Sequence, residues 1–530
     1  MDMVRYHQSE QDIHKMSEQV QNTYANNKRI AKNTMLLYAR MLLLMLISLY
    51  TSRVILNALG VEDYGIYNVV GGVVTMFSAL SGSLSAAISR FITFELGKGN
   101  QKKLNKVFCA SINVQMMLIV LITILLETVG LWFLNTKMTI PTERMTAAFW
   151  VFQISVATFA INLWSVPYNA TIIAHERMSA FAYISIFDAV AKLIIAFLII
   201  KNPFDRLIYY AFLVLVVGLI QRYLYAYYCK KHFVECRYHF SSDKETFKEI
   251  FGFAGWNFIG SSATVLRDQG GNLIINIFFG PTVNAARGIA MQINSAVTGF
   301  VSNFMTALNP QITKNYASGD YEYMFKLVFQ GARLSYYILL IMALPIMFTV
   351  PYLLELWLGI EPEHASNFAI LVLLFTLSEC LAGPLITVML STGNIRNYQI
   401  IVGGCQLLNL PLSFLALKLG FPPESIFAIA IIVSVLCEFT RLLMLKRMVG
   451  LSVGLFLKNV YSNVIIVTML SSVLPFIMVH YFGVNSFVKF IFTALVSLTS
   501  VIFFIYTIGC NNQERKIIIG GFKKLKNRLR

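Results

Sequence analysis

Long apolar runs separated by short polar connectors fill most of the chain. A helix needs about 20 predominantly apolar residues to cross the hydrocarbon core of a bilayer, whereas a membrane β-barrel uses strands of about ten alternating residues. The runs have the length and continuous apolar character of helices, so the pattern predicts an all-α polytopic membrane protein. We expect about 14 transmembrane helices, at 34–58, 65–93, 107–134, 146–173, 179–200, 206–228, 250–279, 284–309, 331–354, 365–391, 397–417, 424–446, 459–480 and 485–509.

Composition narrows the class of protein further. Of the 530 residues, 57% are hydrophobic and 13% are charged, and this charged share is about half that of a soluble domain. The motifs of a serine hydrolase (GxSxG), a nucleotide-binding P-loop and a zinc protease (HExxH) are absent from the sequence. The seven cysteines include no CxxC pair, and the seven histidines are scattered. The sequence therefore predicts no enzyme, no cofactor and no metal site.

The net charge of +17 is explained by where the basic residues lie. Lys and Arg near helix ends favour the cytoplasmic side of a membrane. With the N-terminus placed inside, the inner connectors hold 28 Lys and Arg and the outer connectors hold 6. We therefore expect cytoplasmic N- and C-termini, contact with anionic membrane lipid, and no nucleic-acid partner. The C-terminal GFKKLKNRLR is either a short amphipathic helix on the inner membrane face or a solvated tail.

An internal repeat joins two parts of the chain in one ungapped register. Residues 90–106 (RFITFELGKGNQKKLNK) align with residues 310–326 (PQITKNYASGDYEYMFK) at an offset of 220. The offset predicts two parallel six-helix lobes. The predicted order is a cytoplasmic N-terminal arm (1–33), an N-lobe with helices 1–6 (34–228), a cytoplasmic linker (229–249), a C-lobe with helices 7–12 (250–447), two appended helices (448–509) and a basic cytoplasmic tail (510–530).

Three segments of the chain resemble a known family of transporters. They are ILNALGVEDYGIYNVVGGVVTMFSALSGSLSAAISRFITFELGKGN from the end of helix 1 onward, YNATIIAHERM at the end of helix 4, and NAARGIAMQI after helix 7. They are similar to the polysaccharide and O-antigen flippases of the multidrug/oligosaccharidyl-lipid/polysaccharide (MOP) exporter superfamily. The resemblance covers most of the chain, and it rests on patterns of small and apolar residues.

That resemblance implies transport of a lipid-linked oligosaccharide from the inner to the outer leaflet of a bacterial inner membrane, as in lipopolysaccharide and O-antigen synthesis. It implies a lipid-diphosphate-linked glycan as substrate, and a monomer that works beside other polysaccharide-assembly proteins. The alternative is a cation-coupled multidrug or metabolite efflux transporter of the same superfamily, in which acids dominate the cavity. A membrane enzyme such as a polymerase is disfavoured, because it needs a sizeable outer loop and the outer connectors are short.

Charged residues within the apolar runs are the candidates for the site. A charge at bilayer depth costs at least about 2.5 kcal/mol, so it usually faces a cavity or a partner. Arg40 and Arg53 in the first helix are candidates for binding the diphosphate of the substrate, since a guanidinium binds phosphate bidentately. The alternative for both residues is snorkelling to the two headgroup layers.

Helix 7 carries Arg267 and Asp268 near its middle, followed by Gly270 and Gly271. Glycines can loosen a helix, so we expect either a partly unwound substrate-binding segment or a structural bond between the lobes. Adjacent residues point about 100° apart on a helix, so we do not expect Arg267 and Asp268 to form a simple pair. Arg287 at the start of helix 8 is a further candidate for substrate contact, with headgroup contact as the alternative.

Four other charged residues are candidates for coupling to an ion gradient. Asp188 and Lys192 lie at i,i+4 on one face of helix 5, either as a neutralised pair or as a proton or cation site. Glu127 and Glu379 are expected to be single acids at depth, and an unpaired buried carboxylate takes up a proton.

Three further charged residues are expected to be structural. Glu438 and Arg441 are spaced i,i+3 as a neutralised pair. Arg90 closes helix 2 at the inner face, where we expect a headgroup anchor.

Overall fold

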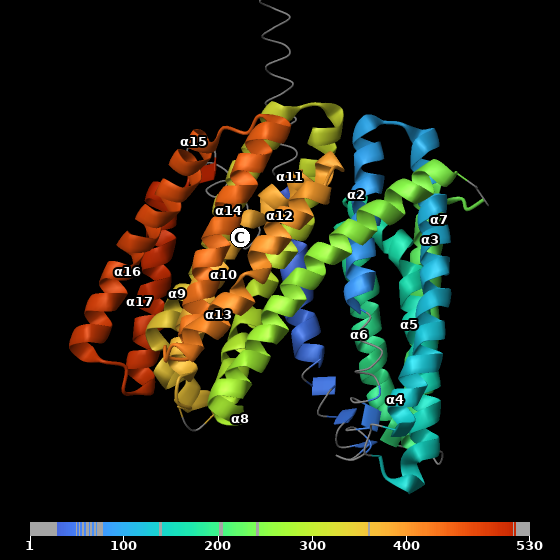
Figure 1. The fold of residues 1–530 in the computed structure, drawn as a ribbon, viewed down its shortest axis with the longest axis horizontal. Helices are drawn as coiled ribbons and strands as arrows, with labels where there is room; N and C mark the ends of the chain where they lie inside the picture. The colour runs from blue at the N-terminus through green and yellow to red at the C-terminus, as the bar shows by residue number, and fades with distance from the viewer. Residues whose placement is uncertain are drawn as a thin grey trace, which may run out of the picture. The chain divides into compact units, whose positions relative to one another are not determined.

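The computed structural model describes most of the chain (Figure 1). The described residues are 29–48, 50–51, 54–55, 58–59, 63, 66–67, 70, 78–136, 140–200, 205–239, 243–358, 361–511 and 514–515. Arg53, most of the predicted N-terminal arm and most of the predicted basic tail lie outside these residues.

By its internal contacts the chain divides into two compact units. Unit 1 comprises Met1–Ser81, Gln101–Asp243 and Thr306–Pro310, and unit 2 comprises Gly82–Asn100, Lys244–Met305 and Gln311–Arg530. The predicted arm, lobes, linker, appended helices and tail stay a prediction.

Unit 1 is helical throughout its described elements. These are a first helix over Arg29–Ser48, α3 (Gln101–Leu125), η1 (Leu126–Gly130), α4 (Leu131–Thr136), η2 (Thr142–Arg144), α5 (Met145–Ala174), α6 (Met178–Ile200), α7 (Arg206–His232) and η3 (Val234–Cys236). Helix α7 packs against α5 and α6, and α3 packs against α5. Asp205 caps α7, because its carboxylate accepts hydrogen bonds from the amides of Leu207 and Ile208.

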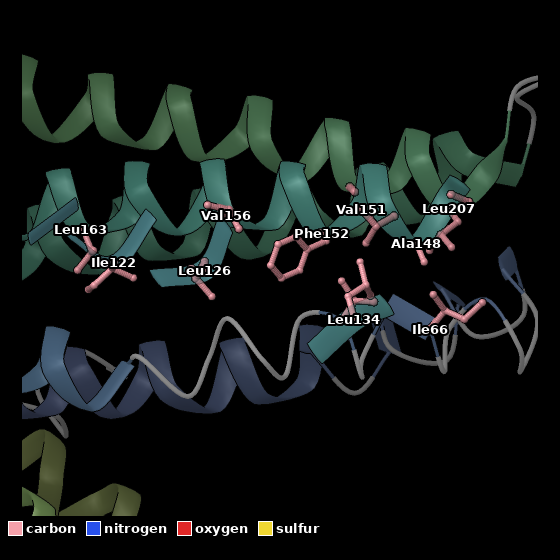
Figure 2. Close-up of a cluster of buried hydrophobic side chains, with 13 residues drawn as sticks. Ile66, Ile122, Leu126, Leu134, Ala148, Val151, Phe152, Val156, Leu163 and Leu207 are labelled. Carbon is pink, nitrogen blue, oxygen red and sulfur yellow. The ribbon is translucent and has the colours of Figure 1, made fainter. Parts of the chain in front are cut away.

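An apolar core fills the space between α3 and α5. Figure 2 shows Ile122 and Leu126 gathered with Phe152 and Val156 in one cluster of buried side chains. A Cβ atom at Gly130 would lie 2.8 Å from the Phe152 ring. The π-helical turn η1 therefore places a glycine where the aromatic ring needs the space.

Unit 2 contains the remaining helices. They are α2 (Ser78–Lys98), α8 (Lys244–Ser318), α9 (Tyr321–Leu358), α10 (Ala365–Cys380), α11 (Ala382–Thr392), α12 (Arg396–Leu407), α13 (Asn409–Lys418), α14 (Ser425–Val449), α15 (Val453–Phe456), η4 (Leu457–Tyr461), α16 (Ser462–Phe482), α17 (Phe487–Phe504) and η5 (Ile505–Gly509). The start of α2 and residues 306–310 of α8 belong to unit 1. Helices α16 and α17 lie side by side and pack against α9 (Figure 1).

The helices are long and apolar enough to cross a membrane many times. Among the described residues, ten helices qualify as spans, and the pair α10 and α11, bent by 41° at Leu381, makes an eleventh. The prediction of an all-α polytopic membrane protein is confirmed, whereas the count of about 14 stays a prediction. The break at Leu381 divides the run that the sequence predicts as one helix over 365–391.

Helix α8 reverses direction, although its residues are helical from Lys244 to Ser318. It contains 75 residues, about 110 Å if straight, which is far longer than a bilayer is thick. Arg287 Nη2 donates to the Asp268 carbonyl at 2.9 Å, although 19 residues of straight helix would separate the two by about 28 Å. The chain therefore folds back between Asn272 and Arg287, as the predicted helices 250–279 and 284–309 require.

The repeat found in the sequence has a structural counterpart. Gly99 and Gly319 both adopt positive φ angles, of 69° and 81°, where glycine has no Cβ to strain. The amide of Gly99 donates to Leu96 and that of Gly319 to Tyr316, at 3.2 Å in each case. The same turn thus ends both helices 220 residues apart.

The correspondence continues along the chain. Helices α5 and α10 begin at Met145 and Ala365. Asp205 and Glu424 occupy the N-caps of α7 and α14. Asp205 binds Arg144, the residue before α5, at 2.6 Å. In the same way, Glu424 binds His364, the residue before α10, at 2.7 Å. Equivalent residues of α7 and α14 are therefore 219 apart, one less than at the first turn.

Ion pairs tie the connectors of unit 1 at the two ends of its helices. Arg144 Nε donates to Asp63 at 2.8 Å and its Nη1 to Asp205 at 2.6 Å. At the opposite end of α5, Arg29 lies 2.9 Å from Glu176. The connectors that hold Asp63, Arg144 and Asp205 thus meet at one end of the helices, and Arg29 meets Glu176 at the other end. Consecutive membrane crossings require this alternation.

Candidate functional site

The most concentrated set of charges within the predicted spans lies in unit 2. Arg267 is 10% exposed, and its Nε donates to Asp268 Oδ1 at 2.9 Å. Its Nη1 lies 3.6 Å from Glu379 Oε2, and its guanidinium lies 5.0 Å from the centre of the Phe375 ring. One guanidinium is thus held between two carboxylates and stacked on an aromatic ring.

The expectation that Arg267 and Asp268 would not pair is wrong. The 100° between neighbouring Cβ directions applies to the start of each side chain, whereas the long arginine stem bends back far enough for Nε to reach the carboxylate. Asp268 itself is 43% exposed. The cluster is therefore closed on the arginine side and open on the aspartate side.

Glu379 is not the isolated acid that the sequence predicts. Besides Arg267, it accepts a hydrogen bond from Ser434 Oγ at 3.0 Å. These partners come from α8 and α14, so the sequence around Glu379 on α10 gives no sign of them.

The segment after Asp268 is helical, so the prediction of an unwound segment is wrong. The two glycines allow close packing instead: a Cβ at Gly270 would lie 2.3 Å from Leu410 Cδ2, and one at Gly271 would lie 3.6 Å from Arg287 Nη2. Small residues of this kind permit close approach between transmembrane helices.

Arg287 points into unit 2. It is 8% exposed, and it donates to the Asp268 carbonyl at 2.9 Å and to Asn272 Oδ1 at 3.4 Å. Arg287 thus contacts the same turn of α8 that carries Arg267. The choice between substrate contact and headgroup contact for Arg287 stays a prediction.

In unit 1, Arg40 lies with its guanidinium 4.4 Å from the centre of the Phe181 ring. Its Nε is buried and has no hydrogen-bond partner among the described residues. Its predicted companion Arg53 lies outside the described residues, so the structure gives the position of Arg40 alone.

The coupling candidates of unit 1 have polar partners. Lys192 Nζ donates to Asp188 Oδ2 at 2.8 Å, as their i,i+4 spacing predicts. Glu127 lies in the π-helical turn η1 and accepts a hydrogen bond from Gln153 Nε2 at 3.0 Å. Glu127 is thus hydrogen-bonded, which the sequence did not indicate.

Arg90 is not a headgroup anchor. Its Nε and Nη2 donate to the carbonyls of Leu390 and Ser391 at 3.1 and 2.8 Å, at the end of α11. Last-turn carbonyls of a helix have no intrahelical partners, so a cation that binds them caps the helix. The predicted Glu438–Arg441 pair does form, with Nη1 and Oε2 3.5 Å apart.

Arg222 on α7 is a further arginine within the predicted spans, and its position did not mark it as a candidate. It lies ten residues from the end of the helix at His232, where basic residues are common and attract little notice. The available signal is its place in the apolar run LVLVVGLIQRYLYAYY, with no acid one turn away. Among the described residues, no group of three or more His, Cys, Asp or Glu could hold a metal ion.

A polar cluster ties the connectors of unit 1 at η3. Glu235 is 4% exposed, His175 Nε2 hydrogen-bonds one of its carboxylate oxygens, and Gln101 Nε2 donates to the other at 3.1 Å. Burial opposes ionisation of Glu235, but the hydrogen bond from His175 and the further polar contacts outweigh it and hold the pKa of this carboxyl below its usual value.

The lowered pKa of Glu235 predicts a pH-dependent contribution to stability. A carboxyl whose pKa is lower in the folded state stabilises that state above the unfolded pKa of about 4.3, and this contribution is lost as pH falls through the folded pKa. Glu235→Gln should therefore melt about 2 °C below the unmodified protein at pH 7, and the gap should close below pH ~4. Melting followed by intrinsic fluorescence in detergent measures this gap. A gap that widens as pH falls would contradict the assignment.

Comparisons with known proteins agree with this architecture. The family model described as polysaccharide biosynthesis protein matches residues 30–316, more than half of the chain. The MatE family model matches residues 265–415. The uncharacterized membrane protein EpsK of Bacillus subtilis (strain 168) is 20% identical over 320 residues, 60% of this chain. The match spans 63% of EpsK, less than two thirds of its length.

Solved structures share the fold. The outward-facing conformation of a multidrug resistance MATE family transporter of the MOP superfamily matches with a TM-score of 0.68 and 14% identity, over 79% of this chain and 95% of that one. A MATE protein in complex with MaD3S matches with 0.70 and 14%, over 80% and 97%. A MOP superfamily transporter from Pyrococcus furiosus Vc1 (DSM3638), described as having a binding pocket of reverse polarity, matches with 0.62 and 15%, over 79% and 95%.

These likenesses confirm the family and the fold class predicted from the sequence. At 14–15% identity the solved structures show the fold alone, whereas the family model covers enough of the chain to show membership. The chain therefore belongs to the polysaccharide biosynthesis protein family.

Proposed function

We propose that the protein moves a lipid-diphosphate-linked oligosaccharide from the inner to the outer leaflet of a bacterial inner membrane by alternating access. In this proposal both termini are cytoplasmic, and the transported glycan is a polysaccharide precursor such as an O-antigen unit of lipopolysaccharide. The protein acts as a monomer, beside other polysaccharide-assembly proteins. Family membership and the buried arginines support this substrate class.

The observation that carries the proposal is the cluster around Arg267. The guanidinium is nearly buried, and its charge is balanced by two carboxylates, one of them 43% exposed. A phosphate group of a diphosphate can present two oxygens to the planar guanidinium, as a carboxylate does, and the diphosphate carries more negative charge, so it can replace Asp268 on Arg267. The acids would therefore hold the arginine in place until the substrate arrives.

Glu379 gives this exchange a route to a proton gradient. A protonated Glu379 no longer neutralises Arg267, so protonation would raise the affinity of the guanidinium for an anion. Ser434 Oγ, 3.0 Å from Glu379 Oε1, can serve either protonation state because a hydroxyl both donates and accepts. Arg287, bonded to the backbone of Asp268, and Arg40 in unit 1 are the further cations assigned to the substrate.

The second candidate is cation-coupled efflux of a drug or metabolite. The MatE match covers residues 265–415 and so includes Arg267, Asp268 and Glu379. In this reading the acids bind the substrate or the coupling cation, and Asp188 with Lys192 serves coupling in unit 1. The two candidates differ in which member of the Arg267 cluster is indispensable.

Replacing Arg267 tests the proposal directly. In a bacterial strain whose surface glycan depends on this protein, Arg267→Ala should reduce glycan export at least tenfold, because the diphosphate loses its bidentate partner. Arg267→Lys should restore part of the export, since it keeps the charge without the planar fork. Glycan on the cell surface and lipid-linked oligosaccharide in the membrane are measured together, and the latter should accumulate.

The matched control is Arg177→Ala, which removes an exposed arginine from a connector. It should export normally, with all variants present in the membrane at equal amounts. Glu379→Gln, which imitates the protonated acid, should keep export but lose its dependence on the proton gradient. Full export by Arg267→Ala, together with lost dye efflux in Glu379→Gln, would overturn the flippase proposal in favour of efflux.

A further inference from the structure

Arg222 on α7 is a buried arginine in contact with two aromatic rings. Its guanidinium carbon lies 4.3 Å from the centre of the Trp164 ring and 4.2 Å from that of Tyr168. Both rings belong to α5, which lies beside α7 (Figure 1). Arg222 is 9% exposed, and its Nε has no hydrogen-bond partner among the described residues.

The repeat shows what is missing beside Arg222. Arg222 lies 17 residues after the cap Asp205, and Arg441 lies 17 residues after the equivalent cap Glu424. Arg441 is neutralised by Glu438, with Nη1 and Oε2 3.5 Å apart. The residue that corresponds to Glu438 in α7 is Leu219, so this half of the chain keeps the arginine and lacks the acid.

Energetics favour an anion at this position. Burying an uncompensated charge is costly, and contacts with two aromatic rings offset only part of that cost. A guanidinium carries five N–H donors, more than Trp164 and Tyr168 can occupy, so donors remain for a ligand. The Tyr168 ring makes an edge-on contact with Phe108. Trp164 is 36% exposed, so a ligand can approach Arg222 from the side of the Trp164 ring.

We propose that Arg222, Trp164 and Tyr168 form a binding site for a phosphate group in unit 1. Arg222 lies about 15 Å from the end of α7 at His232. With the orientation proposed above, Arg222 lies in the inner-leaflet half of α7, below the basic residues Lys230 and Lys231 of its last turn. The phosphate belongs either to a membrane phospholipid or to the lipid diphosphate of the transport substrate, and only the second source rests on the proposed function.

Trp164 provides a reporter for the binding experiment. The full chain in a phosphate-free maltoside detergent is titrated with inorganic diphosphate while tryptophan emission is recorded. A saturable change is expected, and Trp164→Phe should abolish the change while keeping a ring on Arg222. Arg222→Gln should weaken binding at least tenfold, and Arg222→Lys should weaken it less. The exposed Arg177→Gln should bind as the unmodified protein does.

A second variant guards against misfolding of Arg222→Gln. Leu219→Glu places the acid of the other half beside Arg222, and Leu219 is 47% exposed, so the side chain has room. This variant should keep the elution profile and melting temperature of the unmodified protein and yet lose diphosphate binding. Undiminished binding by both Leu219→Glu and a folded Arg222→Gln would overturn the proposal, as would the absence of any saturable change.

Two further measurements identify the source of the phosphate. Emission is compared in nanodiscs of phosphatidylglycerol alone and with added polyprenyl diphosphate, and glycan export is measured for Leu219→Glu. A response to the polyprenyl diphosphate with lost export supports substrate binding. A response saturated by phosphatidylglycerol with normal export supports a phospholipid site. Binding that persists in a protein shown not to export glycan would overturn the proposed function and leave this site standing.

Discussion

Replacing Arg441 by Met is expected to destabilise the protein by about 3–5 kcal/mol, because it leaves a carboxylate buried without its partner. Arg441 and Glu438 have side chains only 2% and 3% exposed, and they face each other at 3.5 Å. Neither Glu438 oxygen has a hydrogen-bond partner among the described residues. Without the guanidinium, Glu438 must stay charged in an apolar bundle or take up a proton. Thermal and chemical unfolding of the full chain in detergent measures the loss.

A double replacement separates the pair from its burial. Glu438→Leu combined with Arg441→Met removes both charges and keeps apolar volume, so it should be far milder than Arg441→Met alone. The control on the same helix is Arg447→Met, an exposed position that should change stability by less than about 0.5 kcal/mol. If the double variant proved as unstable as the single one, the pair itself would not be the source of the loss.

Contacts between residues one turn apart on a helix were predictable from the sequence. The i,i+3 pair of α14 and the i,i+4 pair of α6 follow from helical periodicity, and both form. The turn at Gly99 and its counterpart at Gly319 follow from the repeat, because the same backbone needs a glycine at the same place. The hydrophobic runs indicated the membrane helices, because the thickness of the bilayer sets the length of such a helix.

Contacts between helices were not predictable, because spacing along one helix says nothing about its neighbours. Glu379 looked isolated, yet Arg267 and Ser434 approach it from α8 and α14. Arg90 looked like a lipid anchor, yet it caps α11 some 300 residues away. The contacts of Arg222 with Trp164 and Tyr168 likewise depend on how α5 packs against α7.

Gly97→Ala is expected to destabilise unit 2 by about 1–3 kcal/mol or more, because the new Cβ meets atoms that cannot move aside. It would lie 2.6 Å from the Lys314 carbonyl oxygen, 2.9 Å from Lys314 Cα and 2.8 Å from Ala317 Cβ. Helices α2 and α8 must therefore separate, since the clash is with backbone. On the same helix, Gly82 has nothing within 4 Å of its Cβ position among the described residues, so Gly82→Ala should stabilise the helix by about 0.5–1 kcal/mol. Unfolding of the two variants, measured side by side, should shift in opposite directions.

The repeat sharpens this test, because Gly97 and Ala317 are equivalent residues 220 apart that touch each other. The space between α2 and α8 at this contact holds the Cβ of Ala317 and leaves no room for a second Cβ at Gly97. Gly97→Ala combined with Ala317→Gly removes the clash with the Ala317 Cβ and keeps the two with the Lys314 backbone, so it should recover only part of the lost stability. If the exchange left the protein as unstable as Gly97→Ala alone, the clash with the Lys314 backbone would account for the whole loss and the Ala317 Cβ for none of it.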